Sequence, residues 1–297
     1  MDVMTLSEFN FLKRKLIPES VEVKDISSIT AMTKMIKSAT EIDFMKKASI
    51  INIEIMEFAK KAYKPGMRDV DLQAEIESYA RKDLGHHGSF WLRGGNMEAA
   101  LSLVVTGTSA LAPTYTDFPI GGIGLTPSSA QGASGAIIGE SFVIDFIGTH
   151  HGYNSDSTRT FFINEPETSI KTIYAELTTL LNQIKEMVIL GVTGEDVWNN
   201  LMELISTKSW KEWFMGLDQK VKFVGHGIGV ELNQLPVIAP RQKIKFENNM
   251  TIAIEPKIFI PNYGIIGIEN TYLMRKGKLE SITGSCDNID DFIIRQS

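Results

Sequence analysis

The chain has 297 residues, of which 43% are hydrophobic and 22% charged, as is typical of a globular protein with one large or two ordinary domains. Its net charge of −6 argues against a nucleic-acid-binding surface, and no run approaches the roughly 20 apolar residues that a membrane span needs. Cys286 is the only cysteine, which excludes an intrachain disulfide and favours a reducing cytoplasm. We therefore expect a soluble cytoplasmic protein without membrane or nucleic-acid partners.

The first half of the chain predicts two helices followed by strands. Ser38 and Glu41 have the spacing of a capping box, which predicts a helix over residues 38–63. A second helix is expected over 69–84, with the aspartate at its start as the cap. Strand-like runs dominate residues 89–162.

The second half repeats this plan. Helices are expected over residues 167–190 and 195–207, and strands over 221–284. The repeat is a weak internal duplication of helix, helix and sheet rather than a short-period solenoid. Two such halves that face each other would bring the ends of their sheets to one central site.

An acidic pair lies in the strands of the first half. Asp145 and Asp156 occur in FVIDFIGTHHGYNSDSTRTF, where two apolar runs are joined by a short turn. A hairpin centred between His150 and His151 places the two aspartates directly opposite each other. Directly opposed side chains lie roughly 4.5–5.5 Å apart at Cβ, and like charges at that distance are destabilising.

The second half carries a matching acidic pair. A hairpin centred on Asn262 in TIAIEPKIFIPNYGIIGIENTYL places Glu255 opposite Glu269. Two carboxylates about 4 Å apart repel by roughly 4 kcal/mol at an effective dielectric constant near 20. Two such pairs, each within an apolar hairpin, therefore require a cation.

Several cations could meet this requirement. Arg159 and Lys257 are near in sequence and could form a structural ion-pair network, whereas oxygen ligands alone would suit one Ca²⁺ or Mg²⁺ ion. His226 in KFVGHGIGV, with a glycine on each side that lets backbone and ligand approach closely, adds an imidazole. Mixed imidazole and carboxylate ligands suit Mn²⁺, Fe²⁺, Co²⁺ or Zn²⁺, and two divalent ions would balance four carboxylates.

These motifs resemble those of the pita-bread metallopeptidases, which include methionine aminopeptidase, aminopeptidase P, prolidase and the creatinase-like proteins. The matching features are the spacing from Asp145 to Asp156, GHGIG at His226, IEP at Glu255 and IEN at Glu269. Their order, spacing and flanking residues all fit this family.

The resemblance implies an α+β pita-bread fold built from pseudo-twofold duplicated helix–helix–sheet halves. It divides the chain into a leader over residues 1–37, similar to the end of a creatinase-type amino-terminal domain, and a catalytic domain over 38–297. It also implies a short peptide substrate and a homodimer.

The resemblance further implies a di-metal hydrolase of the Xaa-Pro aminopeptidase or dipeptidase type, which acts on the amino end of short peptides through a metal-bridging hydroxide. Asp145 would bind one ion, Asp156 and Glu269 would bridge both, and His226 and Glu255 would bind the other. Glu255 would also take the proton from the bridging water. Mn²⁺ or Co²⁺ is the expected ion, with Zn²⁺ and Fe²⁺ as alternatives.

The chain departs from the family at two histidines that contact the substrate. Asn233 stands seven residues after His226, where the family has a histidine, and Thr114 aligns with an upstream histidine. Asn233 is a catalytic candidate because its amide can still donate a hydrogen bond. Loss of both histidines leaves open a creatinase-like non-peptidase hydrolase or a non-catalytic homologue that binds peptides or proteins. Thr158 and Thr271 are expected on the faces that carry the ligands.

Overall fold

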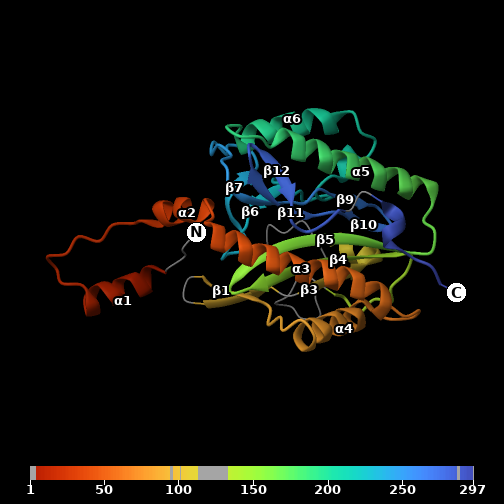
Figure 1. Ribbon diagram of the computed structural model, residues 1–297, viewed down its shortest axis with the longest axis horizontal. Helices are drawn as coiled ribbons and strands as arrows, with labels where there is room; N and C mark the ends of the chain where they lie inside the picture. The colour runs from red at the N-terminus through yellow and green to blue at the C-terminus, as the bar shows by residue number, and fades with distance from the viewer. Residues whose placement is uncertain (1–4, 94–95, 101, 113–132, 286–287, 297) are drawn as a thin grey trace.

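The computed structural model describes most of the chain and shows an α+β architecture (Figure 1). The described residues are 5–93, 96–100, 102–112, 133–285 and 288–296. Thr114, Cys286 and residues 113–132 lie outside them.

The first half contains four helices and five strands within the described residues. They are α1 (Leu6–Leu16), α2 (Ser27–Met35), α3 (Ala39–Ala62), α4 (Asp69–Lys82), β1 (Ser89–Arg93), β2 (Asn96–Ala100), β3 (Ser102–Thr106), β4 (Ser141–His150) and β5 (Tyr153–Ile163), with a 3₁₀ turn at Gly107–Leu111. The expected order of helices followed by strands is confirmed.

The second half begins with two helices and continues with short strands. These elements are α5 (Thr168–Met187), α6 (Gly194–Ser206), β6 (Gly225–Gly227), β7 (Gln234–Ile238), β8 (Thr251–Ile254), β9 (Lys257–Ile260), β10 (Gly264–Gly267), β11 (Asn270–Arg275), β12 (Lys278–Ser281) and β13 (Ile293–Ile294), with 3₁₀ turns at Lys211–Trp213 and Ile289–Phe292. The predicted repeat of helix, helix and sheet is therefore present.

Two larger sheets form the middle of the molecule. One has the order β13-β5-β4-β3 and the other β12-β11-β8-β6-β7, with two-stranded ladders β1-β2 and β10-β9 beside them. Helices α3 and α4 pack on the first sheet, and α5 and α6 pack on the second (Figure 1). The sheets meet where β5 contacts β8 and β11, so each sheet presents one face to the other.

A continuous apolar core joins the halves. It runs from Ile55 of α3 through Phe142 and Phe161 of β4 and β5 to Leu177 of α5 and Ile252 of β8, all at most 1% exposed. Because protein interiors pack to near-crystalline density, this core holds the two sheets in a defined relative position. Charged groups where the sheets meet are consequently held away from water.

The starts of α3 and α4 show one correct and one incorrect prediction. Ser38 and Glu41 form the capping box, with the Ser38 amide 2.7 Å from a Glu41 carboxylate oxygen. Helix α4 has Arg68 rather than Asp69 at its N-cap position. The Asp69 carboxylate instead accepts hydrogen bonds from the amides of Ser134 and Gly135, both at 2.8 Å. The Asp69 side chain, which the local sequence predicts as the helix cap, thus makes a tertiary contact instead.

The leader carries little of the core. Helix α1 buries no side chain, and α2 buries only Met35. Lys34 of α2 forms an ion pair with Glu231, which attaches α2 to the second half. The leader at 1–37 as the end of a creatinase-type domain, with a catalytic domain at 38–297, stays a prediction. Within the described residues, no helix is both long and apolar enough to cross a bilayer.

Gly148 provides a test of the packing between α3 and β4. A Cβ atom at this position would lie 2.2 Å from Asn52 Oδ1 and 2.3 Å from the Ala48 carbonyl oxygen. Overpacking of this kind typically costs about 1–3 kcal/mol. We expect Gly148→Ala to lower the free energy of unfolding by at least this amount in denaturant titrations. Gly139→Ala is the control, because nothing lies within 4 Å of its added Cβ; an equal loss in both variants would contradict the packing argument.

Candidate metal centre

The first acidic hairpin has a different register from the predicted one. Asp145 pairs with Thr158, and Asp156 pairs with Ile147, so the two aspartates are diagonal rather than directly opposed. The predicted register was wrong by two residues. An even shift keeps both carboxylates on one face of the sheet, because successive side chains alternate between faces.

The turn explains this shift. His150 pairs with Tyr153, which leaves His151 and Gly152 as the two central turn residues. Both have positive φ, 49° and 79°. Two-residue hairpin turns of type I′ require positive φ at both positions, and glycine meets that requirement without steric cost at the second. The His-Gly dipeptide was the signal in the sequence for the correct centre.

The second acidic hairpin has the predicted register. Asn262 lies at its centre with a φ of 63°. Two cross-strand pairs flank the glutamates at the same register: Ile254 with Asn270, and Lys257 with Gly267. Glu255 and Glu269 lie between these pairs, where the regular ladder is interrupted, and therefore face each other as expected.

His226 enters from the middle strand of the second sheet. β6 lies between β7 and β8, and Cβ atoms at Gly225 and Gly227 would come within 2.6 Å of the Ala253 carbonyl and 2.2 Å of the Leu235 carbonyl. The glycines thus permit the close backbone approach expected from the sequence. His226 Nδ1 is 3.1 Å from its neighbour's carbonyl oxygen, and Nε2 points to the carboxylates.

The five predicted ligands lie at the junction of the sheets and are all buried. Their exposed fractions are 8% for Asp145, 5% for Asp156 and His226, 3% for Glu255 and 1% for Glu269. His226 Nε2 lies 3.4 Å from Glu255 Oε1 and 4.0 Å from Glu269 Oε1. The predicted convergence of the two hairpins and the GHG segment on one place is therefore seen.

Three of these side chains have the geometry of a single-ion site. Asp156, His226 and Glu269 each offer one ligand atom, and these atoms all lie within 4.8 Å of one another. Asp156 Oδ1 and Glu269 Oε1 are buried without a hydrogen-bond partner among the described residues. Because buried carboxylate oxygens are rarely left unpaired, this donor set fits one divalent cation.

A lysine contacts the remaining carboxylates. Lys257 Nζ lies 2.6 Å from Glu255 Oε2 and 3.6 Å from both Asp145 Oδ2 and Glu269 Oε2. The Lys257 side chain is fully buried. The sequence suggested Lys257 only as a partner in a structural ion-pair network, and the structure places its ammonium within the ligand cluster. The other basic residue of that alternative, Arg159, instead binds backbone and amide oxygens around Glu269 and Asn270.

Burial and mutual repulsion shift the acid–base properties of the cluster. Burial, together with the Glu255 charge, raises the pKa of Glu269 to about 8. Burial, with repulsion from Glu269 and Asp145, raises the pKa of Asp156 well above its usual value. Burial would also raise the pKa of Glu255, but attraction to Lys257 and His226 outweighs it and holds this pKa below its usual value. Asp156 and Glu269, the pair with unpaired oxygens, are thus the carboxyls whose ionised form is least compensated by the surrounding protein.

The two threonines support the cluster as expected. Thr158 donates a hydrogen bond to Glu269 Oε2 at 2.7 Å. The Thr271 hydroxyl donates to the Asp156 carbonyl oxygen and accepts from the Asp156 amide, both at 2.9 Å. These bonds connect β5 of one sheet to the strand region of the other and orient the ligand-bearing residues.

Of the two residues expected in place of the family histidines, the structure describes only Asn233. Asn233 lies immediately before β7 and is exposed, in contrast to the buried ligands. Thr114 falls outside the described residues, so its alignment stays a prediction. His86 is buried against Phe146, away from the cluster, and burial lowers its pKa to about 4.

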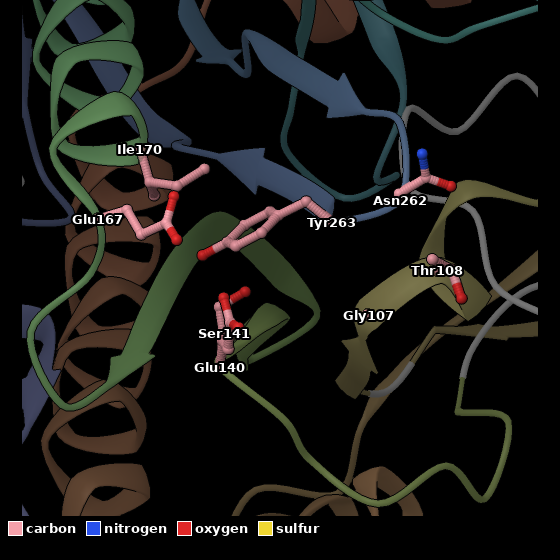
Figure 2. A pocket seen from close by; sticks show the side chains of 8 residues that line it. All are labelled: Gly107, Thr108, Glu140, Ser141, Glu167, Ile170, Asn262 and Tyr263. Atoms are coloured by element: carbon pink, nitrogen blue, oxygen red, sulfur yellow. The ribbon is translucent and has the colours of Figure 1, made fainter.

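A separate cavity of about 500 Å³ lies near the tip of the second acidic hairpin. Figure 2 shows the ring of Tyr263 extending from that tip between Glu167 and Ile170 on one side and Ser141 on the other. None of the five candidate ligands lines this cavity. The described residues of its walls include two acidic side chains, Glu140 and Glu167, and no basic one, so the cavity and the metal cluster are chemically distinct.

Comparison with known proteins identifies the family of this chain. Residues 43–276 match the model of metallopeptidase family M24. An Xaa-Pro dipeptidase of Pyrococcus furiosus is 24% identical over 262 residues, which cover 88% of this chain and 67% of that protein. The chain spans about two thirds of the length of such curated relatives.

Solved structures share the fold. An X-Pro aminopeptidase from Thermotoga maritima superposes with a TM-score of 0.78 at 22% identity, covering 99% of this chain and 73% of that chain. The N-terminal domain of the FACT complex subunit SPT16 from Eremothecium gossypii superposes with a TM-score of 0.74 at 14% identity, covering 98% and 67%. The predicted pita-bread fold is confirmed.

The Thr158 hydroxyl gives a test of the site's support. Thr158→Val keeps the side-chain shape but removes the bond to Glu269, and loss of such a bond typically weakens metal binding about 10–100-fold. We expect this loss for Mn²⁺ in titration calorimetry. Thr106→Val is the control, since Thr106 also has a buried hydroxyl but donates it to the Ser141 carbonyl of β4. Equal Mn²⁺ affinity in wild type and Thr158→Val would contradict the assigned role.

Proposed function

The chain belongs to metallopeptidase family M24, and on this premise we propose that it is a divalent-metal-dependent hydrolase of the Xaa-Pro aminopeptidase or dipeptidase type, acting at the amino end of short peptides. The name of the Pyrococcus furiosus relative supports this substrate class. Membership in a metallopeptidase family implies a divalent ion, and we expect Mn²⁺ or Co²⁺. A cytoplasmic location and a homodimer are part of the same proposal.

The observation that carries the proposal is the buried set of Asp156, His226 and Glu269. Their ligand atoms converge within 4.8 Å, and two of the oxygens have no partner among the described residues. A buried set of this kind would hold an ion and exclude water from most of its surroundings. A bound divalent ion supplies Lewis acidity, which polarises a substrate carbonyl and lowers the pKa of water.

Glu255 is the proposed acceptor of the proton from the attacking water. Its Oε1 lies 3.4 Å from His226 Nε2, beside the converging ligand atoms, and its Oε2 accepts from Lys257 at 2.6 Å. Lys257 and His226 hold the pKa of Glu255 below its usual value despite burial, so the group is a carboxylate at neutral pH and can accept a proton. Glu255 would then return this proton to the leaving amine.

Asn233 is the proposed contact to the substrate carbonyl. Its exposure is compatible with a group that meets substrate from solvent, and its amide can donate one hydrogen bond toward a developing oxyanion. The proline preference rests on the relatives and on no residue identified in this chain.

A second candidate function is a peptide- or protein-binding homologue without hydrolysis. Lys257 favours this candidate, because its ammonium already compensates part of the carboxylate charge that a metallopeptidase leaves to metal ions. The predicted replacement of both family histidines, by Asn233 and Thr114, points the same way.

Turnover of Xaa-Pro dipeptides and tripeptides separates the two candidates. We expect the protein supplied with Mn²⁺ or Co²⁺ to release the amino-terminal residue. Chelation should abolish release because it removes the ion, and His226→Ala should abolish it because the ion loses its imidazole ligand. His151→Ala is the control, since His151 is an exposed hairpin-tip residue. Binding of these peptides without any cleavage would replace the hydrolase by the binding homologue.

Asn233→His tests the departure from the family pattern. A histidine at this position would supply a stronger donor to the oxyanion, and one such donor is typically worth about 10²–10³ in rate. We expect kcat in the peptide assay to rise by a factor that approaches this range. Asn200→His on the exposed face of α6 should leave kcat unchanged. An unchanged or lower kcat in Asn233→His would show that the residue does not meet the substrate carbonyl.

A further inference from the structure

We propose that the centre binds one divalent ion per chain, and that the ammonium of Lys257 permanently occupies the place of a second ion. The proposal rests on the proposed function in so far as a divalent ion binds at Asp156, His226 and Glu269. It changes the two-ion arrangement expected from sequence into a pair made of one metal ion and one lysine.

Geometry excludes a second ion from the position of the ammonium. Lys257 Nζ lies 2.6 Å from an oxygen of Glu255 and 3.6 Å from oxygens of both Asp145 and Glu269. A divalent ion such as Mg²⁺ or Zn²⁺ would stand about 2.0–2.2 Å from each carboxylate oxygen that binds it. An ion bound to these three oxygens would therefore compete for them with a nitrogen atom that already contacts all three.

The lysine cannot readily leave this position. Its side chain is fully buried, so no solvent lies beside it to receive the ammonium. Gly267 is its cross-strand partner, and a Cβ added there would lie 3.0 Å from Lys257 Cγ and 3.3 Å from Cε. The absence of a side chain at Gly267 thus provides the path along which the lysine stem reaches the carboxylates.

The glutamates divide their oxygens between two cation positions. Glu255 directs Oε2 to Lys257 and Oε1 to His226. Glu269 directs Oε2 to Lys257 and Thr158, and its Oε1 faces His226 without a hydrogen-bond partner among the described residues. One position is therefore taken by nitrogen, and the other has the unpaired oxygens and imidazole that suit a metal ion.

Repulsion between cations agrees with this division. Four carboxylates are balanced by four positive charges if two divalent ions bind without the lysine. With the ammonium present, two divalent ions would bring five positive charges into the same buried space. The two ions and the ammonium would then be three cationic centres close to one another. One divalent ion and the ammonium bring three, so the two arrangements leave residual charges of equal size, +1 and −1, and only the single-ion arrangement avoids repulsion between two adjacent metal ions and a lysine.

Metal stoichiometry tests the proposal directly. The wild-type protein and Lys257→Met are dialysed to equilibrium against Mn²⁺, and bound manganese per chain is measured by elemental analysis. We expect one equivalent in wild type and two in Lys257→Met, because methionine keeps the stem but removes the charge. Lys37→Met is the matched control: Lys37 is buried, contacts the Gln234 amide oxygen and Met35 carbonyl, and should leave one equivalent.

The magnetic state of Mn²⁺ provides a second measurement, which needs only the wild-type protein. We expect the spectrum of isolated Mn²⁺ in electron paramagnetic resonance, without the exchange coupling of two ions that share bridging carboxylates. Two equivalents or a coupled spectrum in wild type would overturn the proposal, as would no bound manganese. A folded Lys257→Met that still binds one equivalent would also overturn it.

These results are independent of the peptide assay. One equivalent in wild type with no turnover of any Xaa-Pro peptide leaves the metal–lysine pair intact and removes the proposed hydrolase. Turnover by a protein that binds two coupled ions would support the proposed hydrolase and remove the metal–lysine pair.

Discussion

The burial of four carboxylates where two sheets meet is the constraint on which the rest of the structure depends. Carboxylates at this depth repel one another and lose hydration, so the fold must bring cations to them. Asp145 and Asp156 arrive on one sheet, and Glu255 and Glu269 arrive on the connections of the other. The threonine bonds between the sheets and the continuous apolar core hold these groups together against their repulsion.

Lys257 changes how this constraint is met. A cluster compensated only by metal ions depends on those ions for its stability, because an unpaired buried charge is strongly destabilising. Here an ammonium that is part of the chain contacts three of the four carboxylates. The carboxyls whose ionised form is least compensated are Asp156 and Glu269, beside His226. The same lysine therefore compensates one side of the cluster, and in the proposed arrangement the other side is the place for an ion.

Local signals predicted the elements whose geometry is decided locally. The capping box at Ser38, the centre of the second acidic hairpin at Asn262 and the close backbone approach at the glycines of GHG were all correct. The first acidic hairpin was misplaced by two residues because the His-Gly pair, with positive φ at both positions, was not recognised as the turn. Asp69 was misassigned because its carboxylate binds backbone amides 65 and 66 residues away along the chain.

The sequence by itself determined the kind of fold and identified the acidic and histidine residues that the fold brings together, because motif order, hairpin periodicity and spacing are properties of the chain. Only the tertiary structure decided which cation each carboxylate meets. Lys257 lies two residues from Glu255 in sequence, and its direction is set by the glycine opposite it, Gly267, and by the carboxylates of the facing sheet. Long-range packing, which the local pattern does not contain, turned a nearby basic residue into part of the centre.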